Sequence, residues 1–280
     1  MLTFSNLSYC YHRGRTVLDD INATVGPGIC LLLGENGAGK TTLLGLAGGA
    51  LLARHGDVDF DGECVGDRLP SVMSDIFYLS DNWQSPFKDI YTTARFHGAF
   101  YPNLDLDMLA ANLEAFGLTG REKLKSLSLG MRRKTYIAYA LALRPKLLLF
   151  DEPANGLDIT SRTKLLRMMA RCVSENQTVI ISTHTVWDFQ NLFDGLLVLG
   201  HGSLLINMPI WEIARRVKFV HSFTPVEGAI YQEPDFGQFK AIVPNSDDNE
   251  TTDVDFVVLY NALQSPASRN LVELLSAPES

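Results

Sequence analysis

The chain has 280 residues, of which 46% are hydrophobic and 20% charged, and a formal net charge of -8 at pH 7. That length allows a large buried core in one or two domains. The acidic balance argues against a general nucleic-acid surface, and no apolar run reaches the roughly 18 residues that a membrane helix needs. The N-terminal residues show no signal-peptide pattern. The four cysteines lack Cys-x-x-Cys spacing, which favours reduced thiols and a cytosolic setting.

A glycine-rich loop follows the first strongly apolar stretch, residues 29–33. A buried strand that delivers the chain into such a loop, with a helix after it, is the arrangement that binds phosphate. Glycines let the backbone N–H groups converge on an anion, and the start of the helix adds positive charge. Lysine would reach the outer phosphates, the first threonine would hold Mg²⁺ and the second would bind phosphate. The sequence therefore predicts a nucleoside triphosphate site in the loop Gly34, Glu35, Asn36, Gly37, Ala38, Gly39, Lys40, Thr41 and Thr42.

Two later strands end in residues suited to the same site. Residues 147–150 are apolar, as expected for a strand buried on both faces of a parallel sheet, and Asp151 and Glu152 follow. Ligands bind at the carboxyl edge of such sheets, so Asp151 would join the metal site while Glu152 polarises the attacking water. An acidic turn that caps the strand is the structural alternative. Residues 178–183 form another strand, after which His184 would reach the terminal phosphate or merely cap the strand.

Ser128 and Gly130 precede an apolar stretch that extends to residue 143 and is predicted to be a helix. Serine is a good N-cap, and free backbone amides at a helix start attract anions. The first turn is basic, with Arg132, Arg133 and Lys134, although positive charge there opposes the helix dipole. An anion or an acidic partner would remove this conflict.

The remaining segments suggest the organisation of the chain. Residues 56–62 alternate between polar and apolar side chains and are bounded by glycines, which predicts an edge strand. From about residue 83 to 134, apolar residues recur at helical spacing, which indicates an inserted helical subdomain. Its aromatic residues either pack in the core of the insertion or remain available to a partner. Residues 209–280 differ in character. We expect strands at 219–223, 229–231, 239–243 and 254–259, and a helix at 268–275.

The order of these motifs resembles that of an ABC-type ATPase, the nucleotide-binding subunit of an ABC transporter, over residues 1–208. The resemblance implies an α/β P-loop NTPase core with a mostly parallel sheet, an N-terminal antiparallel β part, the helical insertion and a C-terminal extension at 209–280. Two segments show a narrower resemblance, to bacterial subunits whose membrane half is a separate chain. They are the motif Leu-Ser-x-Gly-Met at residues 127–131 and residues 100–105.

The resemblance also implies roles for individual residues. Residues 34–42 become Walker A, Ser128 and Gly130 the signature loop, and Asp151 the Walker B aspartate. Glu152 becomes the catalytic glutamate, His184 the γ-phosphate switch, and Asp158 the aspartate that communicates between subunits. Tyr11 would stack on adenine with Val17 beside it. Asp81 stands where the family usually has glutamine; it would ligate Mg²⁺ but, when ionised, cannot donate a hydrogen bond.

The implied ligands are ATP and Mg²⁺, and the implied partners are a second ATPase subunit, in a homodimer or heterodimer, and an integral membrane transporter subunit. The chain would lie at the cytoplasmic face of the membrane. Two alternatives remain open at this point. One is an ABC-type switch that acts on ribosomes or DNA, and the other is a regulator that binds ATP without hydrolysing it.

Overall fold

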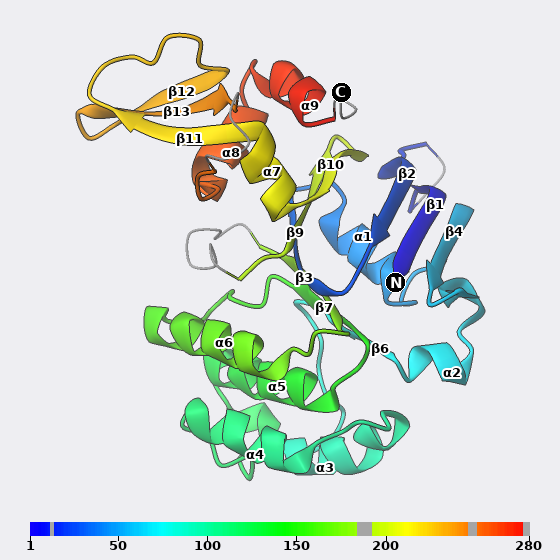
Figure 1. Ribbon diagram of the computed structural model, residues 1–280. Coiled ribbons are helices and arrows are strands. Elements are labelled where there is room, and N and C mark those ends of the chain that lie inside the picture. The colour runs from blue at the N-terminus through cyan, green and yellow to red at the C-terminus, as the bar shows by residue number, and fades with distance from the viewer. Residues whose placement is uncertain (12–13, 184–191, 246–250, 277–280) are drawn as a thin grey trace.

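The computed structural model describes residues 1–11, 14–183, 192–245 and 251–276, and its centre is a six-stranded sheet (Figure 1). The strand order is β10-β9-β3-β8-β7-β6; neighbours from β9 to β6 run parallel, and β10 is antiparallel to β9. This is the mostly parallel sheet that the sequence predicts. Its strands are β3 (Gly28–Gly34), β6 (Ile76–Leu79), β7 (Leu147–Asp151), β8 (Thr178–Ser182), β9 (Gly195–Gly200) and β10 (Ser203–Pro209).

Successive residues of the central strands enter different cores because side chains alternate across a strand. On β3, Leu31 and Leu33 join one hydrophobic cluster, whereas Cys30 and Leu32 join the other. The first cluster contains buried apolar residues of α5 (Leu129–Leu143) and α6 (Ile159–Cys172), and the second contains those of α1 (Lys40–Ala47). The sheet is thus covered on both faces, which explains its continuously apolar strands.

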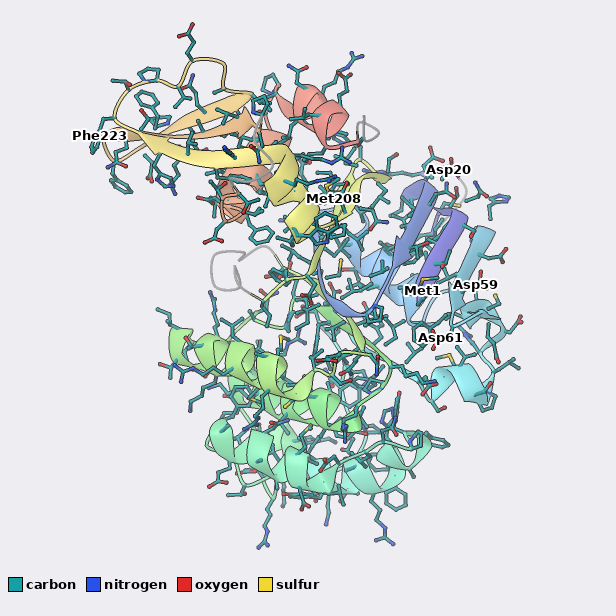
Figure 2. The ribbon with its side chains drawn as sticks, in the orientation of Figure 1. Met1, Asp20, Asp59, Asp61, Met208 and Phe223 are labelled. Carbon is teal, nitrogen blue, oxygen red and sulfur yellow. The ribbon has the colours of Figure 1, made fainter. Side chains whose placement is uncertain are left out.

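A four-stranded antiparallel sheet of order β2-β1-β4-β5 packs over α1 (Figure 1). Figure 2 shows Met1, Asp59 and Asp61 together at one end of this sheet and Asp20 at the other. The prediction of an edge strand at 56–62 was wrong in its position, because β4 has β5 on its outer side; the turn at Asp61 and Gly62 returns the chain to pair again. The strands are β1 (Leu2–Tyr9), β2 (Leu18–Val25), β4 (His55–Phe60) and β5 (Glu63–Cys64).

Short helices occupy the predicted insertion, and several begin at a side-chain cap. Asp89 accepts a hydrogen bond from the Thr92 N–H at the start of α3, and Asp105 accepts one from the Met108 N–H at the start of α4. These caps satisfy N–H groups that a helix start leaves unpaired. The helices outside the central layers are α2 (Pro70–Met73), α3 (Ile90–Phe96), α4 (Leu106–Ala115), α7 (Ile210–Arg216), α8 (Phe256–Leu263) and α9 (Ser268–Ser276).

The C-terminal part contains an antiparallel sheet of order β11-β13-β12, beside which α8 and α9 lie (Figure 1). The expected strand at 254–259 was wrong, because this segment starts α8. Asp255 caps that helix by accepting hydrogen bonds from the N–H groups of Val257 and Val258. A short apolar run fits a strand or a buried helix equally well, so the pattern alone was ambiguous. The strands are β11 (Val217–Ser222), β12 (Tyr231–Asp235) and β13 (Gln238–Pro244).

Aromatic residues of the insertion divide into an inner and an outer group. Trp83 and Tyr101 pack against the core and contact the Phe77 ring edge-on at 5.7 Å. Phe96 and Phe100 instead have exposed fractions of 52% and 74%. The core-packing interpretation is therefore confirmed for the inner group, and contact with a partner stays a prediction for the outer group.

His97 lies within the inner aromatic group and leads to a prediction about pH. Its Nδ1 lies 2.7 Å from the Tyr139 hydroxyl, and burial lowers the pKa of His97 below its ordinary value of 6.5. At a pH below 6.5, His97 is protonated in the unfolded chain but largely neutral in the folded chain, where its pKa is lower. The free energy of unfolding therefore falls as pH is lowered from about 7 to about 5. We expect His97→Gln to show a weaker decrease in urea unfolding experiments. The exposed His55→Gln is the control, and an unchanged pH dependence in His97→Gln would contradict the prediction.

Candidate active site

The predicted phosphate loop connects β3 to α1, as its motif requires. No side chain in the described part of the chain caps α1, whose N-cap is Gly39 with a φ of 105°. The N–H groups of its first turn are therefore left for a ligand. Gly39 permits a backbone conformation that side-chain-bearing residues rarely adopt.

Lys40 is buried at the start of α1. Its Nζ donates hydrogen bonds to the carbonyl oxygens of Gly34, at 2.7 Å, and Glu35, at 3.1 Å. Burial lowers the pKa of Lys40, while the charges of Glu152 and Asp151 act in the opposite direction. The ammonium group thus lies across the loop, close to the two carboxylates at the end of β7.

Asp151 is the centre of a hydroxyl cluster. Its Oδ2 accepts a hydrogen bond from Thr41 Oγ1 at 2.8 Å, and its Oδ1 accepts one from Ser182 Oγ at 2.6 Å. The Tyr78 hydroxyl donates to Oδ2 at 3.4 Å, and burial together with the Asp151 charge raises the pKa of Tyr78. A carboxylate next to a threonine hydroxyl is an oxygen donor set of the kind that Mg²⁺ prefers. The residues present therefore fit that ion.

No group of three or more His, Cys, Asp or Glu side chains in the described ranges is placed to hold a metal ion. A magnesium site next to a nucleotide needs no such group. Mg²⁺ keeps several waters and takes phosphate oxygens, so one or two protein ligands suffice. The pair formed by Thr41 and Asp151 agrees with that expectation.

Glu152 follows β7 in an unusual backbone conformation. Its φ is +49°, and its N–H donates hydrogen bonds to the Ser182 carbonyl at 3.0 Å and the Ser182 hydroxyl at 3.1 Å. The alternation of side chains along a strand does not extend past the end of β7 at Asp151. Both residues line one cavity.

This cavity has a volume of about 750 Å³ and receives residues from four separate segments. Tyr11 lies at its edge, with its hydroxyl 3.0 Å from Thr42 Oγ1 and its ring edge-on to Tyr9 at 5.1 Å. Arg15, Thr16, His201 and Gly202 also line it, and sequence reasoning missed them as site residues because no motif spacing marks them. The lining residues that the sequence predicts are Tyr11, Val17, Glu35, Asn36, Gly37, Ala38, Gly39, Lys40, Thr41, Thr42, Asp151 and Glu152.

The signature residues lie elsewhere, at the starts of α5 and α6. Ser128 caps α5, its Oγ accepting a hydrogen bond from the Met131 N–H at 3.2 Å, and Asp158 caps α6. Lys134 connects α5 to the cap of α6 through an ion pair of 3.0 Å with Asp158, and this hydrogen bond is the main cause that lowers the pKa of Asp158. A Cβ on Gly130 would lie 2.9 Å from the Gly156 carbonyl oxygen, so the two loops touch.

Asp81 does not line the cavity. Its carboxylate lies 3.5 Å from the Arg133 guanidinium, and 51% of its side chain is exposed. The expectation that Asp81 completes the metal shell thus finds no support in this arrangement. The predicted switch residue His184 lies outside the described residues.

A second cavity of about 440 Å³ adjoins the loop on the side of the C-terminal part. Tyr260 and Gln264, on α8 and just beyond it, line this cavity together with Glu152. Sequence reasoning assigned no chemistry to these residues, because only the folded chain brings α8 to the phosphate loop. The residues that line this second cavity are Gly34, Glu35, Asn36, Glu152, Asn155, Tyr260 and Gln264.

A parallel sheet, a phosphate loop at its carboxyl edge and an acidic strand end beside it define a P-loop nucleoside triphosphatase. A family model described as ABC transporter matches residues 18–155. The ABC transporter ATP-binding protein YtrB of Bacillus subtilis (strain 168) is 30% identical over 250 residues, which cover 85% of this chain and 85% of that protein. The chain therefore belongs to the family of ABC transporter ATP-binding proteins, and the family resemblance is confirmed.

Other relatives and structures agree. The taurine import ATP-binding protein TauB of Escherichia coli O157:H7 is 31% identical over 226 residues, covering 77% of this chain and 86% of that protein. A solved ATP-binding subunit of an ABC transporter matches with a TM-score of 0.69 at 24% identity, covering 77% of this chain and 92% of that one. The predicted fold class is confirmed, and the chain is the ATP-binding subunit of an ABC transporter.

Proposed function

We propose that this subunit hydrolyses ATP in the cavity between its phosphate loop and the end of β7, and that hydrolysis powers transport through a separate membrane-spanning partner. The observation that carries the proposal is the convergence of Lys40, Thr41, Asp151 and Glu152 on that cavity. A cation, a hydroxyl–carboxylate pair and a second carboxylate are the groups that phosphoryl transfer to water requires.

Each residue has a defined task in this reaction. Lys40 leaves the loop carbonyls for the outer phosphates, and the loop N–H groups neutralise further charge. Glu152 takes a proton from water as the water oxygen bonds to the γ-phosphorus, the bond to the β–γ bridging oxygen breaks and ADP leaves. Bound Mg²⁺, held by Thr41 and Asp151, would neutralise charge on the phosphates. Tyr11 and Val17 would hold the adenine, and His184 would contact the γ-phosphate.

The signature residues would serve the nucleotide of a second subunit. Ser128, Gly130 and Asp158 lie away from the cavity of their own chain, beside Leu129 and Ile159, whose exposed fractions are 76% and 80%. Large apolar residues exposed beside polar phosphate-binding groups are typical of an interface. ATP would therefore be bound between two head-to-tail subunits, in a homodimer or heterodimer, and hydrolysis would release them.

The helical insertion offers the surface for the membrane partner. Among the described residues, no helix is both long and apolar enough to cross a bilayer. We place the transport pathway on another chain and this subunit at the cytoplasmic face of the membrane. In this proposal, residues 1–208 form the ATPase domain with its helical subdomain at about 83–134, and residues 209–280 form a C-terminal extension.

Truncation of the exposed aromatics on the insertion tests this surface. We expect the double substitution Phe96→Ala and Phe100→Ala to weaken binding to the membrane partner at least about tenfold, because buried aromatics dominate interface energies. The measurement is co-purification from gently solubilised native membranes. Phe223→Ala is the matched control, since this side chain is 79% exposed at the far end of the C-terminal sheet (Figure 2). Equal recovery of the partner with both proteins would contradict the assignment.

The same co-purification from native membranes, with and without ATP, tests the transport role itself. An integral membrane protein recovered in stoichiometric amount supports the proposal. Recovery with ribosomes or a cytosolic chain, and with no membrane protein, would replace transport by a switch function while leaving the ATPase chemistry intact.

A further inference from the structure

Arg133 is a buried cation that the proposed reaction does not use. Its side chain is 6% exposed, although it projects from the start of α5, in a basic stretch that the helix dipole disfavours. Its guanidinium donates hydrogen bonds to five backbone carbonyl oxygens. They belong to Ser80 at 3.2 Å, Asp81 at 3.2 Å, Asp151 at 2.6 Å, Glu152 at 2.8 Å and Pro153 at 3.4 Å.

These carbonyl groups lie on two loops, and the N–H donors of the planar guanidinium bridge them. Ser80 and Asp81 follow β6, and the other acceptors span the end of β7 and the turn after it. Arginine suits this task because its planar donors have a fixed geometry, which lysine lacks. One side chain therefore sets the spacing between the loop that carries Asp81 and the loop that carries Glu152.

A buried cation needs a compensating anion, and Asp81 supplies one. Its carboxylate lies 3.5 Å from the guanidinium. Burial lowers the pKa of Arg133, and Asp81 is the largest of the charges that oppose this shift, ahead of Asp151 and Glu152. Asp151 is already engaged by the hydroxyls of Thr41 and Ser182. The glutamine that the family usually has at position 81 would bring no charge to this pair.

We infer that Arg133 and Asp81 form a clamp that positions Glu152 for catalysis, and that Asp81 acts in this chain as the anchor of Arg133 rather than as a metal ligand. This inference rests on the role proposed for Glu152. The clamp holds the Glu152 carbonyl from one side, while Ser182 holds its N–H from the other. Both peptide groups of a residue with a φ of +49° are thereby fixed.

Helix α5 connects the clamp to the signature loop. Ser128 begins the helix, and Tyr136, one turn beyond Arg133, contacts the Trp83 ring edge-on at 4.8 Å and accepts a hydrogen bond from the Ser85 N–H at 3.4 Å. The segment after Asp81 is thus docked on the same helix. A shift of α5 on assembly with a partner would move both loops together, and with them Glu152.

Asp81→Asn separates the clamp from a metal-ligand role. We expect kcat for ATP hydrolysis to fall about tenfold with KM for ATP nearly unchanged, because an amide keeps the shape but not the charge. The Mg²⁺ concentration that gives half-maximal activity should stay within about twofold of the original protein's value. A large rise in that concentration, with kcat restored at saturating Mg²⁺, would make Asp81 a metal ligand and overturn the inference.

The matched control lies at the opposite ends of the same two strands. Asp75, just before β6, forms an ion pair of 2.7 Å with Lys146, just before β7. Asp75→Asn removes a charge from an equivalent strand junction that is remote from the cavity, so kcat should remain within about twofold. An equal loss of kcat in both variants would assign the effect to general destabilisation and contradict the clamp.

Substitutions of Arg133 complete the test. Arg133→Lys keeps the charge without the fork, and we expect kcat to fall about 100-fold while ATP affinity persists. Combined with Asp81→Asn, it should cause little further loss, because both changes break one unit. Should Arg133→Lys fail to fold, Asp81→Asn alone decides. Normal kcat in Asp81→Asn would disprove the clamp alone. Normal kcat in Glu152→Gln would instead disprove the proposed role of Glu152, on which the clamp rests.

Discussion

Glu152→Gln should lower kcat for ATP hydrolysis about 10³-fold, the usual contribution of a general base. The side chain lines the cavity next to Asp151, and its backbone is held on the N–H side by Ser182. Glutamine is nearly isosteric but cannot take the proton from the attacking water. ATP binding should persist, because Lys40 and the loop N–H groups are unchanged. The measurement is phosphate release at saturating ATP, together with the ATP affinity.

The same variant should accumulate as an ATP-bound dimer. If ATP binds between two subunits and hydrolysis separates them, a chain that binds but cannot hydrolyse is trapped in the closed state. Size-exclusion chromatography with and without ATP detects this. Glu114→Gln, an exposed change on α4, is the control and should behave like the original protein. Unchanged phosphate release in Glu152→Gln would contradict the role of Glu152 in the proposed mechanism. A variant that stays monomeric both with and without ATP would contradict the proposed dimer.

Local chemistry explains why the phosphate loop could be predicted from sequence. Its strand, glycines and lysine lie within one short segment, so the motif itself contains the geometry. Asp151 could be predicted equally well, because a run of apolar residues before an acidic pair indicates the end of a buried parallel strand. The fold class followed from the resemblance to ABC-type ATPases that these motifs and their order carry. Within the loop and at the end of β7, the residues that matter are neighbours both in sequence and in space.

The remaining features depend on contacts between distant segments. Asp81 was expected near the metal because it stands where the family usually has glutamine, but a buried arginine 52 residues away in sequence lies against it. The basic turn of α5 looked unfavourable because its acceptors, the carbonyls beyond β6 and β7, are visible only in the folded chain. Tyr260 reaches the phosphate loop through the packing of α8, a helix that begins within residues 254–259, where the apolar run predicted a strand.

Gly39→Ala should abolish measurable ATP binding. The φ of Gly39 is 105°, and a Cβ there would lie 2.6 Å from Leu18 Cδ2 and 3.2 Å from the Val17 carbonyl oxygen. The methyl group must displace either the loop or the buried Leu18 side chain and the Val17 carbonyl, and a displaced loop loses the convergence of its N–H groups. Two lost charge-assisted hydrogen bonds lower affinity at least about 100-fold. Strain and overlap together should lower the free energy of unfolding by about 2 to 5 kcal/mol.

Two other glycines separate strain from overlap in that prediction. Gly62 has a φ of 86°, and a Cβ added there would meet no described atom within 4 Å; it lies in the turn between β4 and β5, away from the cavity. Gly62→Ala should cost only the strain, about 1 to 2 kcal/mol, and leave ATP affinity intact. Gly37 has the same φ and equally open surroundings but lies in the phosphate loop. If Gly37→Ala also binds ATP normally while Gly39→Ala does not, the contact of position 39 with β2, rather than backbone strain, governs the shape of the loop. Normal binding by Gly39→Ala would instead show that the loop adapts, and would contradict the prediction.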